Sequence, residues 1–189
     1  MFDNSNISFH KKCQPYRFSF QANYKNLFIP NYYSNMIERV AELLKQKKFW
    51  VATAESCTGG LVAHMLTNIP GSSEYFKGSV VAYSNEVKMK VLGVKEETLK
   101  EYGAVSEQTA KEMASGVKKL LDVDLAVATT GIAGPGGATP TKPVGLVYIG
   151  LATPEGVEAR RFLFKGDRLQ NKESFAKAAL NMLLEYLEG

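Results

Sequence analysis

Short apolar segments alternate with longer amphipathic segments along most of this sequence, and this order constrains the fold more than any other feature. The apolar segments have the length and composition of strands, and the last two flank a Pro-Glu-Gly turn typical of a hairpin. The expected strands lie at 49–55, 77–84, 123–131, 144–153 and 157–166. We therefore expect an α/β fold: a three-layer α/β/α sandwich with a mixed sheet of about five strands and helices on both faces.

Helical periodicity marks the segments around these strands. Ser106 is placed to cap a long amphipathic helix, and Asp167 and Gln170 have capping-box spacing at the start of the closing helix. Asn35 and Glu38 have the same spacing at the start of the first helix. The expected helices span 35–48, 58–69, 85–93, 95–103, 105–122 and 167–187.

The composition excludes several classes of protein. With 189 residues, 45% of them hydrophobic and 22% charged, the chain suits one globular domain, or one domain with an extension. Two cysteines and two histidines without metal-ligand spacing predict neither a disulfide framework nor a bound metal, and we expect no cofactor. No signal region and no run of about 20 apolar residues is visible, so we expect a cytoplasmic protein without a membrane partner.

Residues 1–33 differ from the rest of the chain. They are rich in aromatic residues and contain most of the net charge of +4, with Asp3 as their single acidic residue. The remainder is close to neutral and has no basic stripe, so we expect no nucleic-acid partner. We predict an N-terminal arm at 1–33, without a catalytic role, that lies on the main domain or on a neighbouring subunit. The main domain is then 34–189, and we expect a homo-oligomer.

The stretch TAESCTGGLVAHML, at 53–66, is the first candidate site. Ser56 lies where an expected strand passes into a helix, a junction that exposes a side chain and presents free backbone N–H groups. Thr58, Gly59 and Gly60 follow, and the glycines would let a substrate approach the backbone closely. A nucleophilic Ser56 would find donors for an oxyanion here. From spacing alone, the simpler interpretation is that Ser56 or Thr58 caps the helix.

A nucleophile at this position needs a base. Cys57 competes with Ser56, but a cysteine nucleophile usually works with a histidine. His64 lies about two helical turns further along, where we expect it to point away. The segment AYSNEVK places Tyr83 at a strand end and Lys88 one turn into a helix, and parallel strands would bring both to the rim where Ser56 lies. A buried lysine can act as a base, although the pattern alone favours an ordinary exposed Lys88.

The Gly/Pro-rich loop that begins at Thr130 is a further candidate. It lacks the Gly-Lys-Ser/Thr ending of a Walker motif and leads into a strand, so we exclude a nucleotide loop of that class. Its N–H groups could still contact an anion or a substrate amide. Arg168, at the start of the closing helix, suits a phosphate, and a simple surface arginine is the alternative.

Seven motifs occur in one order: AESCTGG, GSSEYFKGSVVAYSNEVK, LGV, GAVSEQTA, TGIAGPGG, KPVG and GDR. Together they resemble the nicotinamide mononucleotide amidase family, also known as the C-terminal domain of the competence-damage protein CinA. The similarity runs from about Asn35 to Leu187. The full-length proteins of that family carry a large additional N-terminal domain, and residues 1–33 resemble no part of it.

The resemblance implies a domain that hydrolyses the carboxamide of nicotinamide mononucleotide by a serine–lysine mechanism. It implies that Ser56 is the nucleophile and that Tyr83 and Lys88 handle protons. It also implies that Thr130 and Gly131 line the site. Arg168 would then lie near the phosphate of this small nucleotide substrate. Two alternatives stay open: a nucleotide-binding module without turnover, and an amidase with a different substrate.

Overall fold

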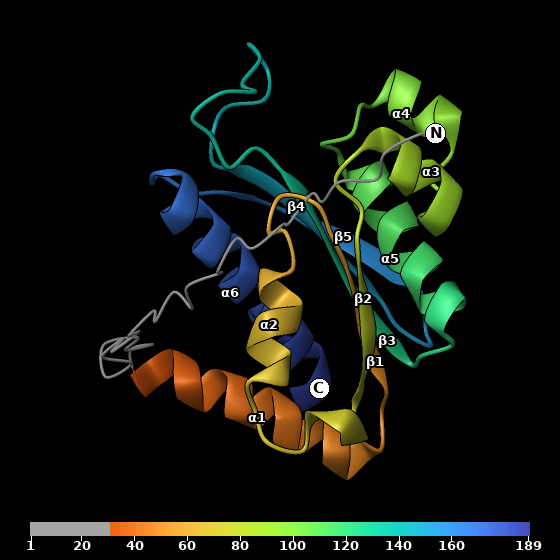
Figure 1. The fold of residues 1–189 in the computed structure, drawn as a ribbon, viewed down its shortest axis with the longest axis vertical. Helices are drawn as coiled ribbons and strands as arrows, with labels where there is room; N and C mark the ends of the chain where they lie inside the picture. Colours follow the sequence, from red (N-terminus) through yellow and green to blue (C-terminus); the bar gives the residue numbers. More distant parts are fainter. Residues whose placement is uncertain (1–30) are drawn as a thin grey trace, which may run out of the picture.

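The structure, a computed structural model, describes residues 31–189 (Figure 1). The predicted arm at 1–33 lies outside the described residues except for its last three positions, which belong to the first helix. The strands are β1 (Val51–Glu55), β2 (Phe76–Val81), β3 (Leu125–Gly131), β4 (Leu146–Ala152) and β5 (Val157–Leu163). The helices are α1 (Asn31–Lys47), α2 (Leu61–Thr67), α3 (Asn85–Leu92), α4 (Glu96–Glu101), α5 (Glu107–Leu121) and α6 (Arg168–Glu188), with a 3₁₀ turn, η2, at Ser72–Glu74.

The five strands form one mixed sheet in the order β2-β1-β3-β4-β5. β1 is parallel to both β2 and β3, whereas β4 is antiparallel to β3 and β5 antiparallel to β4. The expected α/β fold, the mixed sheet and the hairpin are therefore confirmed. Because β1, β2 and β3 run in one direction, their carboxyl ends meet at one edge of the sheet, which is where ligands bind in open α/β sheets.

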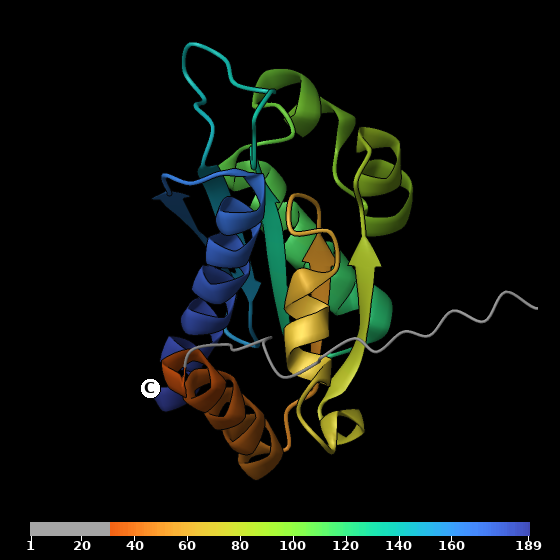
Figure 2. The same cartoon turned by 60° about the vertical axis from the view of Figure 1, so that its left-hand side comes forward.

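Helices cover both faces of the sheet (Figures 1 and 2). α1, α2 and α6 pack on one face over large strand side chains such as Val127 and Ile149. α5 packs on the other face, with α3 and α4 beside it, over a surface of small residues. That surface includes Ala52, Ala54, Ala126 and Ala128. A Cβ added at Gly150 would lie 2.3 Å from the Ala110 carbonyl oxygen, so the small residues let α5 approach the sheet closely.

Two helix starts agree with the sequence and one does not. Ser106 accepts a hydrogen bond from the Thr109 N–H, and Asp167 forms a full capping box with Gln170. Asn35, by contrast, lies inside α1, which begins at Asn31, so the prediction that Asn35 begins the first helix is wrong. The capping-box spacing there occurs by chance within a longer helix.

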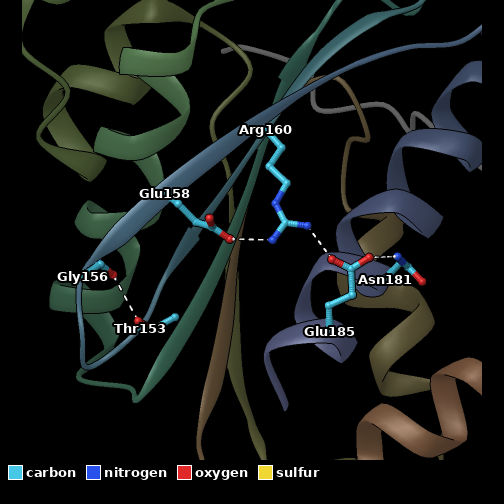
Figure 3. Close-up of polar contacts among 6 residues, drawn as sticks. All are labelled: Thr153, Gly156, Glu158, Arg160, Asn181 and Glu185. Atoms are coloured by element: carbon cyan, nitrogen blue, oxygen red, sulfur yellow. Dashed lines mark hydrogen bonds and ion pairs between the residues drawn. The ribbon is translucent and has the colours of Figure 1, made fainter. Parts of the chain in front are cut away.

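Polar side chains link the outer strand β5 to α6. Arg160 of β5 forms ion pairs with Glu158 on its own strand and with Glu185 of α6, and Asn181 donates a hydrogen bond to Glu185 (Figure 3). The hairpin turn before β5 is closed by the Thr153 hydroxyl, which donates to the Gly156 carbonyl. These groups are exposed, so they contribute little to stability.

Over residues 31–189, no helix combines the length and apolar character needed to cross a membrane.

Candidate active site

A cavity of about 270 Å³ lies at the carboxyl edge of the parallel strands. Ser56 follows β1, Tyr83 and Lys88 follow β2, and Thr130 and Gly131 end β3. Arg168 reaches the same cavity from the first position of α6. The structure thus brings together six of the predicted site residues: Ser56, Tyr83, Lys88, Thr130, Gly131 and Arg168.

Lys88 is held against Ser56. The Ser84 side chain caps α3 by accepting the Val87 N–H, which fixes the helix on which Lys88 lies. Lys88 is only 1% exposed, and its Nζ lies 3.0 Å from Ser56 Oγ. The same Nζ donates to the carbonyl oxygens of Ala82, at 2.8 Å, and Tyr83, at 3.3 Å. The pattern-based expectation of an exposed lysine is therefore wrong at this position.

Burial lowers the pKa of Lys88 below that of an ordinary lysine, because the charged form loses its hydration. A neutral amine has two N–H donors and one lone pair. The two carbonyl oxygens can take both donors, which leaves the lone pair for the Ser56 hydroxyl proton. This is the arrangement that a serine nucleophile and its general base require.

Cys57 is not suited to nucleophilic chemistry. Its side chain is buried, and burial raises the pKa of its thiol to about 12, so the reactive thiolate is scarce at neutral pH. His64 is exposed, lies by Asn68 and lines a different cavity from Ser56. The predicted orientation of His64 away from the site is confirmed.

The start of α2 is not capped as the spacing suggested. Neither Ser56 nor Thr58 caps the helix. The N–H groups of Gly60, Val62 and Ala63 instead bind the carboxylate of Glu55, the last residue of β1. The capping group therefore belongs to the strand before the turn. Sequence patterns for helix caps cover only the residues next to the helix start, so they do not include it.

The predicted substrate contacts at Thr58, Gly59 and Gly60 are not supported. The Thr58 side chain is fully buried, and its hydroxyl binds Glu55 and Thr129. Gly59 and Gly60 have φ angles of 63° and 96° and line the other cavity, beside His64. Their positive φ angles make them turn-forming residues.

The backbone N–H groups that follow Ser56 are only partly available to an oxyanion. The Gly59 N–H donates to the Ser56 carbonyl, and the Gly60 N–H is bound by Glu55. Among the hydrogen bonds of the described residues, none joins the N–H group of Cys57 or Thr58 to another residue. These two groups are the remaining candidates in the turn.

Tyr83 and Arg168 pair with each other at the mouth of the cavity. Arg168 donates to the Tyr83 hydroxyl, at 3.0 Å, and to the Gly134 carbonyl, at 2.7 Å. The Tyr83 side chain is 62% exposed, and no hydrogen bond of the described residues joins its hydroxyl to Lys88. Only its backbone carbonyl supports Lys88. No contact among the described residues therefore supports the predicted proton-handling role of the Tyr83 side chain.

Thr130 and Gly131 shape the wall of the cavity. The Thr130 side chain is 1% exposed and donates to the Ala104 carbonyl at 2.5 Å, which ties β3 to the segment before α5. A Cβ added at Gly131 would lie 2.6 Å from the Leu146 carbonyl oxygen, so the close approach of β4 requires glycine there. Within residues 31–189, no cluster of three acidic, histidine or cysteine side chains could hold a metal ion.

Comparison with known proteins agrees with this architecture. A family model described as the CinA C-terminal domain matches residues 33–187. The chain belongs to the CinA C-terminal domain family. Among solved CinA structures, the competence/damage inducible protein CihA from Agrobacterium tumefaciens superposes with a TM-score of 0.81 at 39% identity, covering 86% of this chain and 99% of that chain. A CinA superfamily protein from Klebsiella pneumoniae gives 0.80 at 34% identity, covering 82% and 98%.

Curated CinA relatives are similar in sequence but longer. A CinA-like protein of Chloroherpeton thalassium is 57% identical over 156 residues, which cover 80% of this chain and 37% of the relative. A putative competence-damage inducible protein of Caldicellulosiruptor bescii is 58% identical over 146 residues, which cover 77% and 36%. The chain thus spans little more than a third of the length of these relatives.

Proposed function

We propose that the cavity at Ser56 hydrolyses the carboxamide of nicotinamide mononucleotide to nicotinate mononucleotide and ammonia. The observation that carries the proposal is the buried amine of Lys88, 3.0 Å from Ser56 Oγ and held by two backbone carbonyls. Membership of the CinA C-terminal domain family supports it, because the motifs AESCTGG and AYSNEVK that resemble the amidases supply these two residues.

The proposed reaction has two stages. Neutral Lys88 takes the Ser56 hydroxyl proton while Oγ attacks the carboxamide carbon, and the N–H groups of Cys57 and Thr58 stabilise the oxyanion. Lys88 then returns the proton to the leaving nitrogen, so ammonia departs and a nicotinoyl ester remains on Ser56. Water, deprotonated by Lys88, cleaves the ester and restores the serine. No metal takes part in this scheme.

Arg168 and Tyr83 take the role of substrate recognition in this scheme. Arg168 lies at the first position of α6, and its guanidinium suits a phosphate. The Tyr83 hydroxyl accepts a hydrogen bond from Arg168 and so orients it. We therefore assign Tyr83 to positioning Arg168, in place of proton transfer.

The test is ammonia release from nicotinamide mononucleotide, the riboside, free nicotinamide and the dinucleotide. We expect turnover of the mononucleotide by the wild type and a loss of about a thousandfold or more in Ser56→Ala. Arg168→Ala should raise KM for the mononucleotide far more than for the riboside, since only the former has a phosphate.

Three results would redirect the proposal. Full activity in Ser56→Ala would remove the nucleophile assignment. Absence of turnover, with nucleotide affinity kept in Lys88→Met, would favour a binding module. Faster release of ammonia from another amide would leave the chemistry in place and change the substrate.

A further inference from the structure

Glu55 is a fully buried carboxylate at the last position of β1, directly before Ser56. The mechanism proposed above does not use it. Five donor groups surround its two oxygens. Oε2 accepts from the Thr58 hydroxyl and from the N–H groups of Gly60 and Val62, and Oε1 accepts from the Ala63 N–H. The Thr53 hydroxyl lies 3.2 Å from Oε1 and also contacts Ser79 Oγ, at 2.7 Å.

These partners match an ionised carboxylate. Three of the five are backbone N–H groups, which can only donate. The Thr58 hydroxyl gives its single proton to Glu55, so the Thr129 hydroxyl, 2.7 Å from it, donates to Thr58. An ionised carboxylate is acceptor-only, and here it meets donors at both oxygens. Its charge also occupies the positive end of α2, so the substrate phosphate is left to Arg168.

Glu55 connects to both reacting side chains. Its carboxylate holds Thr58, Gly60, Val62 and Ala63, so it fixes the far end of the turn that contains Ser56. Its backbone carbonyl accepts the Ala82 N–H at 2.8 Å, and the Ala82 carbonyl in turn accepts from Lys88 Nζ at 2.8 Å. One residue therefore anchors the serine turn through its side chain and the lysine through its main chain.

We propose that Glu55 is a positioning residue of this site, whose buried carboxylate fixes the Ser56–Gly60 turn and thereby holds Ser56 Oγ against Lys88 Nζ. The proposal rests on the proposed function only in taking Ser56 as the nucleophile. In Glu55→Gln, an amide of the same shape turns an NH₂ group toward the N–H donors, so the turn shifts. Displacement of a nucleophile by about 1 Å costs on the order of a hundredfold in rate.

The experiment compares Glu55→Gln with Glu112→Gln. Glu112 also binds the start of a helix, since its carboxylate accepts the Lys95 N–H and the Thr98 hydroxyl at α4, but it does not line the cavity. Two rates are measured in full-length protein: ammonia release from nicotinamide mononucleotide, and labelling of Ser56 by a fluorophosphonate probe, followed by intact mass. Thermal unfolding of each variant records its loss of stability.

We expect Glu55→Gln to lower kcat and the labelling rate together by about a hundredfold, with KM unchanged within about twofold. Glu112→Gln should lose stability and keep both rates. Equal rates in the two variants would overturn the proposal. If Glu55→Gln does not fold, Glu55→Asp takes its place, because its shorter side chain also shifts the turn, and wild-type rates in that variant would overturn the proposal as well.

The two readouts separate this proposal from the substrate assignment. A wild type that releases no ammonia but is labelled at Ser56, with labelling slowed in Glu55→Gln, contradicts the amidase proposal and supports the positioning role. A wild type that releases ammonia, together with a Glu55→Gln variant that is equally fast, supports the amidase proposal and contradicts the positioning role.

Discussion

Lys88 is the residue that most distinguishes this site from an ordinary helix terminus. It is buried, and within residues 31–189 its Nζ contacts one hydroxyl and two carbonyl oxygens. Carbonyl oxygens accept hydrogen bonds from either protonation state but do not carry the full charge that would stabilise an ammonium. The site therefore lowers the pKa of Lys88 through burial and still keeps its nitrogen in place.

The pH dependence of activity follows from this lowered pKa. Only neutral Lys88 can accept the Ser56 proton, so kcat/KM for the mononucleotide should rise with pH through the pKa of Lys88. The midpoint of this rise should lie below 10.5, the ordinary value for lysine. A pH profile of ammonia release measures this. A midpoint at or above the ordinary lysine value would contradict the role of Lys88 as a desolvated base.

Stability should change with pH in the same sense. Because the pKa of Lys88 is lower in the folded protein, the unfolded chain binds more protons between the folded value and 10.5. The free energy of unfolding then rises with pH across that window, by up to about 1.4 kcal/mol per pH unit. Lys88→Met should remove this rise and should stabilise the protein most at pH values below the window. Urea unfolding of the variant and wild type at pH 7 and 10 measures the difference. Lys90→Met, on the exposed side of the same helix, is the matched control.

At the scale of elements, the site depends on how closely α3 packs against α5. Gly116 of α5 faces the end of α3, and a Cβ added there would lie 1.8 Å from the Leu92 carbonyl oxygen. α3 also carries Lys88. The spacing between these two helices therefore sets the position of the base relative to the sheet that carries Ser56.

Gly116→Ala should reverse the usual effect of alanine in a helix. Replacing glycine by alanine inside a helix normally stabilises it by about 1 kcal/mol, but here the added methyl group overlaps backbone and should destabilise by about 1–3 kcal/mol. Ser115→Ala, at an exposed neighbouring position of α5, should instead be neutral or slightly stabilising. Urea unfolding of both variants is the measurement. A Gly116→Ala variant as stable as Ser115→Ala would show that α3 moves away at little cost.

Elements were predictable from the sequence to different degrees. The first four strands were found because each contains a short apolar run, and the charged strand β5 was found from the Pro-Glu-Gly turn before it. The caps at Ser106 and Asp167 were found because capping is a local pattern. The role of Glu55 was not found. The available signal was a charged residue at the end of the apolar run VATAE. The N–H groups that bind its carboxylate lie at the start of the helix after the turn, and the sequence alone did not show this contact.

At the scale of the whole molecule, distance along the chain limited what could be predicted. Tyr83 and Arg168 are 85 residues apart and meet because β2 ends and α6 begins at the same edge of the sheet. The burial of Lys88 depends likewise on strands and helices that the local pattern does not contain. The motifs indicated the candidate residues of the site, whereas the hydrogen-bond partners of Tyr83, Thr58 and Glu55 could be identified only from the structure.

The fold also predicts how much of the chain the site needs. Every described residue that lines the Ser56 cavity lies between 56 and 168, and the family match begins at 33. Removing residues 1–30 should therefore leave kcat within about twofold and cause only a small change in thermal stability, since no described element is lost. Ammonia release and thermal unfolding of the shortened and full-length chains measure this.

The same pair of chains tests the proposed homo-oligomer. Among the described strands, β5 pairs on one side only, with β4, so the described domain offers this outer edge for pairing with a second copy. Light scattering should then give the same oligomeric mass for both chains. A shortened chain that is monomeric but fully active would assign assembly to residues 1–30 and catalysis to the domain alone. One that is monomeric and inactive would show that the site needs a neighbouring subunit or residues 1–30, because all of its described lining residues would still be present.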